Sequence, residues 1–408
     1  MRNKSIDFEK LAAELDISPT MHKYAVDRYN GISAYLESQG ISAEFSPQGS
    51  FRTGTVTRPI KGGIESDFDI DTVCKISKKK DDTSPAIIKS SVGDALKHCD
   101  TYLKKLLPED DRCWTLKYAD VTNGVGLNLD VVPAVADTNS QISKLIIKGV
   151  QPAYAREAVS ITEKKANQEY EWVSSNPKGF GEWFDSINAR FLTVNLYENK
   201  KRIFQENRLL FSAVSNIEDV PDYYVKSSLQ RVIQLLKRHR DLYFERIENG
   251  DNLRPGSIII TSLSAKIASQ ATTVELSELL SFVVHGLKDY SLLLQGKRPL
   301  VRFDGEARNY IDKRDQKWWI PNPVNPDDNY ADSWTDETAK AFFLWVDTVG
   351  MDLSDISVDN ESRYMAGLQA SLGKEFVFNA LSLNTQSITA KIAKPLTHPT
   401  KPWGMNLK

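Results

Sequence analysis

Two aspartates and a glycine-serine turn lie near each other in the sequence, and their residue types suit phosphate chemistry. Asp69 and Asp71 open an apolar run, so on a strand both carboxylates point to one face, roughly 6.5–7 Å apart. Gly49 and Ser50 come earlier in the chain. The glycine lets the backbone approach a phosphate, and the serine adds a hydroxyl. Two carboxylates beside such a turn indicate a Mg²⁺ site for phosphoryl or nucleotidyl transfer.

A third aspartate, Asp130, stands in an otherwise apolar strand. The segments 114–121 and 125–135 flank an Asn-Gly turn and predict a β-hairpin. A lone carboxylate in an apolar strand is costly unless it is paired or binds a metal, so we expect Asp130 to lie beside Asp69 and Asp71. Three carboxylates can hold two Mg²⁺ ions about 3.5–4 Å apart, with Mn²⁺ as the alternative ion. One ion would activate a ribose hydroxyl, and the other would neutralise a triphosphate and its pyrophosphate leaving group.

The elements that must position these residues follow from the apolar periodicity and from proline and glycine breaks. A short strand at 41–45 leads into the Gly-Ser turn, and the proline-rich stretch 318–329 forms a rigid bend. The tail 394–408 has no clear periodicity. Helices are predicted at 6–16, 20–39, 53–57, 85–107, 163–174, 183–192, 222–245, 257–268, 274–295, 335–350 and 356–372.

The composition is that of an ordinary soluble protein. The 408 residues favour two or three lobes, and a net charge of −2 gives no global attraction to nucleic acid or to an anionic membrane. No run approaches the roughly 18–20 apolar residues that a membrane span needs, and the N-terminus has no signal-peptide core. The three cysteines lack paired spacing and suit a reducing compartment. We therefore expect a cytoplasmic protein without a membrane partner.

The run QGSFRTGT at the Gly-Ser turn, the DID triplet and the third aspartate resemble the DNA polymerase beta superfamily of nucleotidyltransferases. Within it, the chain is similar to the cGAS- and DncV-like CD-NTases of bacterial CBASS antiphage systems. The resemblance implies that the catalytic, metal-binding acids are Asp69, Asp71 and Asp130. It also implies that Gly49 and Ser50 hold the donor phosphates.

The resemblance extends into the second half of the chain. Lys237 matches a lysine that contacts the triphosphate, and Ser257 matches a helix-opening serine that meets the same phosphates. Lys237 also lies in a basic cluster that could be only a solvated helix end, and Ser257 also suits an N-cap. The segment 322–329 resembles an Asn/Asp-Pro-rich segment shared with oligoadenylate synthases, and it equally suits structural bracing.

Three further polar residues have two interpretations each. Arg52 and Thr53 flank the Gly-Ser turn, and they either touch phosphate or pin the loop. Asp67 stands two residues before Asp69 and is expected at the strand entrance rather than in the metal site. His239 is expected to be structural, because two-metal nucleotidyl transfer needs no imidazole base.

These observations predict an α+β fold with two lobes. A polymerase-beta-like nucleotidyltransferase lobe with a mixed twisted sheet and N-terminal backing helices covers residues 1–175. A mostly helical second lobe covers 176–408, with the active site in the cleft between the two. The resemblance implies a Mg²⁺-dependent enzyme that joins NTPs, ATP among them, into a cyclic di- or trinucleotide messenger for antiphage defence, with release of pyrophosphate. It also implies a separate effector protein that the messenger activates, and it allows a regulatory partner.

Other functions fit parts of the same pattern. The chemistry also suits a linear oligonucleotide synthase or a nucleotidyltransferase toxin that modifies a macromolecule. A non-catalytic nucleotide-binding protein is disfavoured by the intact set of three acids. The chain lacks four His or Cys ligands at zinc-module spacing, and with its charge of −2 it shows no DNA-sensing platform. The sequence leaves open the nucleobases, the ring size, the linkage, the mode of activation and the oligomeric state.

Overall fold

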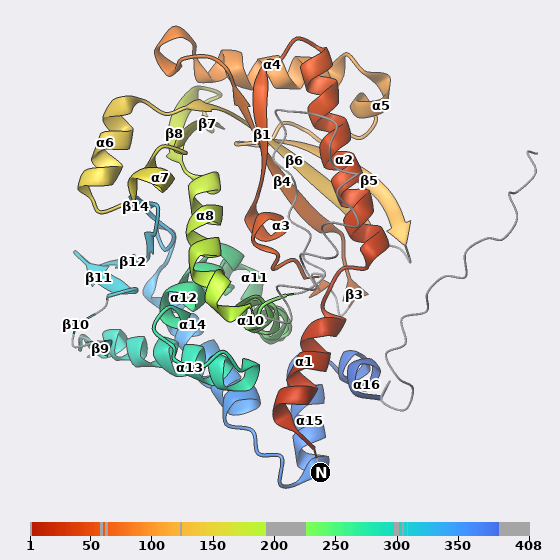
Figure 1. Ribbon diagram of the computed structural model, residues 1–408, viewed down its shortest axis with the longest axis vertical. Helices are drawn as coiled ribbons and strands as arrows, with labels where there is room; N and C mark the ends of the chain where they lie inside the picture. The colour runs from red at the N-terminus through yellow and green to blue at the C-terminus, as the bar shows by residue number, and fades with distance from the viewer. Residues whose placement is uncertain are drawn as a thin grey trace, which may run out of the picture.

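A mixed six-stranded sheet forms the upper part of the molecule in Figure 1. The computed structural model describes residues 2–57, 60–61, 64–122, 125–192, 226–297, 302–303, 306–307 and 309–382. The strands pair in the order β1-β4-β6-β7-β8, and β5 also pairs with β6. Only β4 and β6 run parallel within this sheet. The strands are β1 (Ala43–Gln48), β4 (Phe68–Ile76), β5 (Trp114–Thr122), β6 (Val125–Ala136), β7 (Val159–Lys164) and β8 (Tyr170–Ser175).

Two helices pack on this sheet and complete its core. The helices α2 (Pro19–Ser38) and α4 (Pro85–Lys97) each begin with a proline, and a serine caps each one. Proline suits the first helical position because its missing N–H needs no partner there. Tyr29 and Ile32 of α2 and Val92 of α4 are fully buried against sheet residues such as Leu129. The fold is therefore α+β, as predicted.

A second core is almost entirely helical and forms the lower part of the molecule (Figure 1). Its central helix, α10 (Ser228–Glu245), is buried along most of its length. Around it lie α1 (Lys4–Glu14), α8 (Pro177–Asn188), α12 (Ser257–Ala268), α13 (Leu276–Lys288), α14 (Asp336–Val349), α15 (Glu361–Leu372) and α16 (Lys374–Ser382). The helix α1 buries Phe8 and Leu11 in this core rather than against the sheet. The lobe boundary at 175/176 stays a prediction.

The remaining described elements are short. They are α3 (Gly49–Thr53), β2 (Ile60–Lys61), β3 (Ile64–Glu65), η1 (Lys80–Asp82), α5 (Asp100–Leu103), α6 (Asn139–Ile147), α7 (Pro152–Ala155), η2 (Ala189–Phe191), α11 (Gly250–Leu253), η4 (Asp289–Gln295), β9 (Arg302–Phe303), β10 (Glu306–Ala307), β11 (Asp312–Arg314), β12 (Lys317–Trp319), β13 (Pro321–Asn322), β14 (Asn325–Asn329) and η5 (Gly350–Ser354). None of the described helices is long and apolar enough to cross a membrane.

Four predicted elements differ from the structure. The predicted helix 163–174 is wrong, because the chain forms the antiparallel pair β7–β8 there, with Gln168 in a left-handed conformation in the turn (φ 67°). The predicted helix 85–107 ends at Lys97, and a separate turn of helix, α5, follows. The predicted helix 53–57 lies earlier, as α3. The bend at 318–329 contains short strands. The tail 394–408, the start of the predicted helix 222–245 and the Asn-Gly turn lie outside the described residues.

Candidate active site

Three aspartates share one face of the two parallel strands. In the register of β4 and β6, Asp71 lies opposite Asp130, and Asp69 lies opposite Asn128. Neighbouring strands are about 4.8 Å apart, so the three carboxylates are close enough to repel one another. Burial, together with the charges of Asp130 and Asp69, raises the pKa of Asp71 to about 7. Burial and the charge of Asp69 also raise the pKa of Asp130. A bound cation would relieve this repulsion.

Neighbouring side chains orient two of these carboxylates. The Asn128 amide donates a hydrogen bond to Oδ1 of Asp69 (3.0 Å), and the Thr115 hydroxyl donates one to Oδ1 of Asp130 (2.5 Å). Within the described part of the chain, no three His, Cys, Asp or Glu side chains converge closely enough to enclose one metal ion. The fit to a divalent cation therefore rests on the hard oxygen donors and on the charge that they place together.

The Gly-Ser turn adjoins these carboxylates directly. Gln48, the last residue of β1, lies opposite Asp71 in the sheet, and Gly49 then opens the short helix α3 with φ +63°. A methyl group on Gly49 would lie 2.6 Å from Oδ2 of Asp71, which is closer than real Cβ contacts. Only glycine therefore suits this position, both for its backbone conformation and for its contact with Asp71.

Arg52 and Thr53 pin α3 in place. The Arg52 guanidinium forms a 2.8 Å ion pair with Asp185 of α8, and the Thr53 hydroxyl donates to the Gly49 carbonyl (3.1 Å). Of the two interpretations of these residues, the geometry favours the one in which they hold the loop.

A cleft of about 700 Å³ separates the sheet from the helical core. Asp67, Asp69, Lys117 and Asn128 line its sheet side, and Arg240, Asp241, Arg254 and Ser257 line its helical side. Asp69 and Ser257 are the two predicted site residues on its wall. Asp67 accepts a hydrogen bond from the Gly126 amide (2.8 Å) at the entrance of the two strands, as expected.

Comparisons with known proteins agree with this geometry. Residues 43–131, which include the turn and the three aspartates, match the nucleotidyltransferase domain of the cyclic GMP-AMP synthase DncV-like family. A c-di-GMP synthase of Roseivirga ehrenbergii is 27% identical over 393 residues, which are 94% of this chain and 87% of that protein. The first match identifies residues 43–131 as a nucleotidyltransferase domain of the DncV-like type. The chain is therefore a nucleotidyltransferase.

Two further similarities cover most of the chain. The cyclic dinucleotide synthase CdnG of Bradyrhizobium diazoefficiens is 25% identical over 337 residues, which are 80% of this chain and 68% of that protein. The solved structure of CdnG in complex with GTP shares the fold, with a TM-score of 0.63 at 20% identity, and the match covers 94% of this chain and 99% of CdnG. The structure of CdnC from E. coli MS115-1 with ATP has a TM-score of 0.56 at 16% identity, and the match covers 91% of this chain and 98% of CdnC.

Lys237 lies inside the protein. Its ammonium donates to the carbonyl (3.1 Å) and the hydroxyl (3.0 Å) of Thr55, just after the Gly-Ser turn. Burial, together with the charge of Arg240, lowers its pKa to about 7. The interpretation of Lys237 as a solvated helix end is wrong, because α10 continues to Glu245. Its contact with a triphosphate stays a prediction.

Ser257 stands on the cleft wall beside an arginine that the sequence analysis did not single out. Gly256 occupies the N-cap position of α12, so the N-cap interpretation of Ser257 is wrong. Arg240 donates to the Ser257 hydroxyl (3.0 Å) and pairs with Asp241 (2.6 Å). Arg254 also lines the cleft. The basic run at 237–240 was the available signal for Arg240, and nothing in the sequence marked Arg254.

The remaining singled-out residues are structural. The buried His239 accepts from the Trp345 indole (3.1 Å) and contacts Asp352 (3.0 Å), which ties α10 to α14 and η5. Asn329 braces the segment 318–331 by accepting hydrogen bonds from the backbone amides of Ile320 and Ala331.

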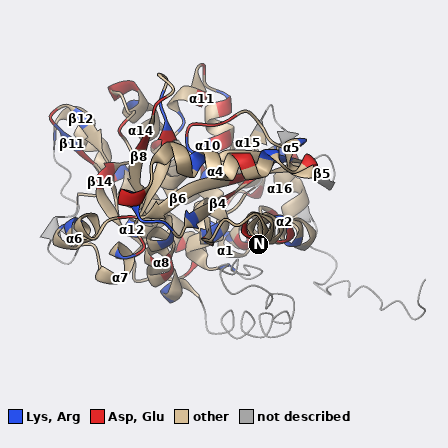
Figure 2. Ribbon diagram, turned by 90° about the horizontal axis from the view of Figure 1, so that it is seen from above, with Lys and Arg blue, Asp and Glu red and all other residues tan. Residues whose placement is uncertain are grey.

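Basic and acidic residues are interspersed over the described elements when the molecule is viewed from above (Figure 2).

Proposed function

We propose that this enzyme is a CD-NTase that joins two nucleoside triphosphates into a cyclic dinucleotide and releases pyrophosphate. The observation that carries the proposal is the placement of Asp69, Asp71 and Asp130 in register beside the Gly49 turn. Relatives named as a c-di-GMP synthase and a cyclic dinucleotide synthase, aligned over most of the chain, support it. On the same basis we propose GTP as at least one of the two substrates.

The proposed roles follow from where the side chains lie. Asp69, Asp71 and Asp130 would hold Mg²⁺, which when bound polarises phosphate oxygens and favours the deprotonated ribose hydroxyl. Gly49 and Ser50 would orient the donor phosphates through close backbone approach and a hydroxyl. The ribose oxygen of the acceptor bonds to the donor α-phosphorus, and the bond to pyrophosphate breaks. A second such reaction between the two joined nucleotides closes the ring.

Lys237 and Ser257 are proposed to assist with the phosphates from the helical side. Ser257 lines the cleft. Lys237 would either support the Gly-Ser turn through its hydrogen bond to Thr55 or give up that hydrogen bond to contact a phosphate. We further propose that the enzyme is cytoplasmic and that its product activates a separate effector protein during phage infection. This last part rests on the family resemblance alone.

Product analysis tests this function. Purified protein is incubated with the four NTPs and Mg²⁺, then treated with phosphatase, and the products are analysed by mass spectrometry. We expect a phosphatase-resistant cyclic dinucleotide that contains guanine, and we expect EDTA to prevent its formation. A linear product that phosphatase degrades, or nucleotide attached to protein or tRNA, would overturn the proposal.

Replacing Thr115 by valine should weaken the metal site without disturbing the sheet. Valine keeps the shape but removes the hydroxyl that donates to Asp130, and this hydrogen bond lowers the pKa of Asp130. Loss of such a supporting contact typically costs about 10–100-fold in metal affinity. We expect the Mg²⁺ concentration for half-maximal activity to rise at least about tenfold, and the acid limb of the pH-rate profile to move to higher pH.

A matched control for this variant lies in the same sheet. Thr162 of β7 is buried, and its hydroxyl has no hydrogen-bond partner among the residues that the structure describes, so Thr162→Val should leave the Mg²⁺ requirement unchanged. An unchanged Mg²⁺ requirement in Thr115→Val would argue against Asp130 as a metal ligand.

A further inference from the structure

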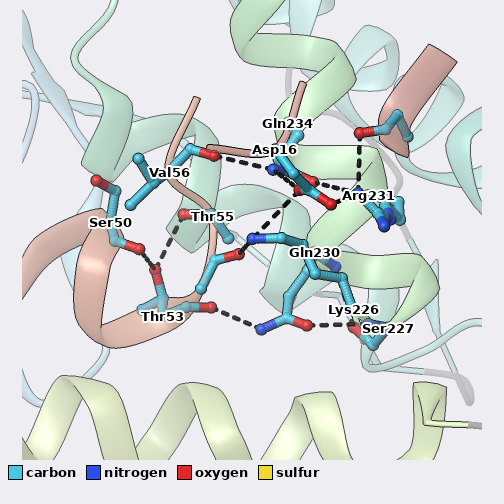
Figure 3. A network of polar contacts seen from close by, with 12 residues as sticks. Asp16, Ser50, Thr53, Thr55, Val56, Lys226, Ser227, Gln230, Arg231 and Gln234 are labelled. Carbon is cyan, nitrogen blue, oxygen red and sulfur yellow. Dashed lines mark hydrogen bonds and ion pairs between the residues drawn. The ribbon is translucent and has the colours of Figure 1, made fainter. Parts of the chain in front are cut away.

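The backbone carbonyls of the four consecutive residues 53–56, after the Gly-Ser turn, accept hydrogen bonds from side chains. Three of the donor side chains belong to α10, and the fourth is Lys226, two residues before the helix begins. The three donors within α10 are spaced three or four residues apart, so they lie on one face of the helix. Figure 3 shows the segment with Thr53, Thr55 and Val56 opposite Gln230 and Gln234. The hydrogen bonds are Gln230 Nε2 to Thr53 O (2.9 Å), Lys226 Nζ to Gly54 O (2.8 Å), Lys237 Nζ to Thr55 O (3.1 Å) and Gln234 Nε2 to Val56 O (2.9 Å).

The two glutamines of this set are themselves held in place. Gln230 belongs to the capping box of α10, and its Oε1 accepts from the Ser227 amide (2.9 Å). The Gln234 amide also donates to Asp16 (3.0 Å), and its Oε1 accepts from Arg231 (3.3 Å). Both side chains are fully buried. Because each amide uses its oxygen on one partner and its nitrogen on the loop, neither can turn away without leaving buried polar atoms unpaired.

The bound carbonyls are coupled to the turn at short range. The Thr55 amide donates to the Ser50 carbonyl (2.9 Å), and the Thr53 hydroxyl donates to the Gly49 carbonyl (3.1 Å). A shift of the segment 53–56 therefore moves Gly49 and Ser50, and Gly49 already lies against Asp71. The contacts from α10 thus fix the turn relative to the carboxylates.

We propose that Gln230 and Gln234 are positioning residues that hold the Gly-Ser turn at reaction distance from the three aspartates. The inference rests on the proposed function, in which Gly49 and Ser50 hold the donor phosphates. Phosphoryl transfer depends chiefly on positioning and electrostatics, and a displacement of about 1 Å can cost roughly 100-fold in rate. The helical core therefore contributes to the reaction through two neutral amides that touch no substrate.

The test compares three methionine variants. Gln230→Met and Gln234→Met keep the length of the side chain and remove the hydrogen bonds to the loop. Arg238→Met is the matched control, because Arg238 is also buried on α10 but donates to the Leu372 carbonyl (3.1 Å), away from the turn. The measurements are amide hydrogen exchange of the peptide 49–56, KM for GTP and kcat.

In both glutamine variants we expect exchange of the amides of 49–56 to accelerate about tenfold or more, and KM for GTP to rise about tenfold, with a smaller fall in kcat. The Arg238→Met protein should lose thermal stability but keep wild-type exchange in this peptide and wild-type KM. Wild-type exchange and KM in the glutamine variants would overturn the proposal. The same changes in Arg238→Met would also overturn it, because they would reflect general destabilisation.

The exchange measurement needs no catalysis, so it separates this inference from the proposed function. If the wild-type protein joins no nucleotides, the proposed function fails while faster exchange still supports the positioning contacts. If a methionine variant does not fold, the corresponding Gln→Asn variant is used. Its amide is one methylene too short to reach the loop, and the same expectations apply.

Discussion

The Asp71→Asn protein is expected to lose nucleotide joining by at least about 10³-fold and, without a divalent cation, to unfold at a higher temperature than the wild type at pH 8. Asparagine has the shape of aspartate but carries no charge, so it binds a divalent cation poorly. It also removes the repulsion with Asp130 and Asp69 that, together with burial, raises the pKa of Asp71 to about 7. The same substitution therefore removes activity and relieves strain in the cation-free protein.

The pH dependence of this stabilisation has a definite sign. The ordinary pKa of an aspartate is 3.8, and that of folded Asp71 is about 7. Between these values the folded protein keeps a proton that the unfolded chain has released. The contribution of Asp71 to stability is thus present below about pH 4 and is lost as the pH rises through about 7. The asparagine variant lacks this loss, so its advantage in melting temperature should grow from pH 5 to pH 8.

Mg²⁺ should stabilise the wild type much more than the Asp71→Asn protein. The cation binds the deprotonated carboxylates, so it should raise the melting temperature of the wild type at pH 8 and that of Asp71→Asn much less. Thermal unfolding of each protein is measured under four conditions, at pH 5 and pH 8, each with and without Mg²⁺. Asp81→Asn, at an exposed position of η1, is the control and should behave like the wild type. Activity of Asp71→Asn within tenfold of the wild type would contradict the site assignment.

The aspartates could be found from the sequence because their signal is local. Asp69 and Asp71 alternate on one strand, and Asp130 is a charge in an apolar strand that needs a partner. The parallel pairing of β4 and β6 then brings Asp130 beside Asp71. Their spacing predicts that they bind Mg²⁺, and the family resemblance adds that they are the catalytic acids.

The other parts of the site depend on contacts that no local pattern encodes. Lys237 meets Thr55 across 182 residues of sequence, so the basic cluster could not be recognised as buried. The same reason hid Arg240 and Arg254 on the cleft wall. The segment 163–174 forms strands rather than the predicted helix because β8 pairs with β7, and β7 in turn pairs with β6 at the edge of the sheet.

Replacing Gly49 by alanine should cost at least about 100-fold in activity, because the added methyl group would lie 2.6 Å from Oδ2 of Asp71. Either the turn or the carboxylate must move, and both belong to the proposed site. The left-handed backbone at Gly49, with φ +63°, adds a stability cost of roughly 1–2 kcal/mol for a residue with a side chain. The contact of the methyl group with Asp71 lowers activity, whereas the backbone strain lowers stability, so the two effects can be measured separately.

Gly40 provides that separation. It also has a left-handed backbone, with φ +81°, but a methyl group there would meet no atom within 4 Å. Gly40→Ala should therefore lose a similar amount of stability in chemical denaturation while keeping near-wild-type activity. If the contact with Asp71 matters, kcat/KM falls only in Gly49→Ala. If both variants lose activity equally, backbone strain is the cause, and the close approach of the turn to Asp71 has no role in the reaction.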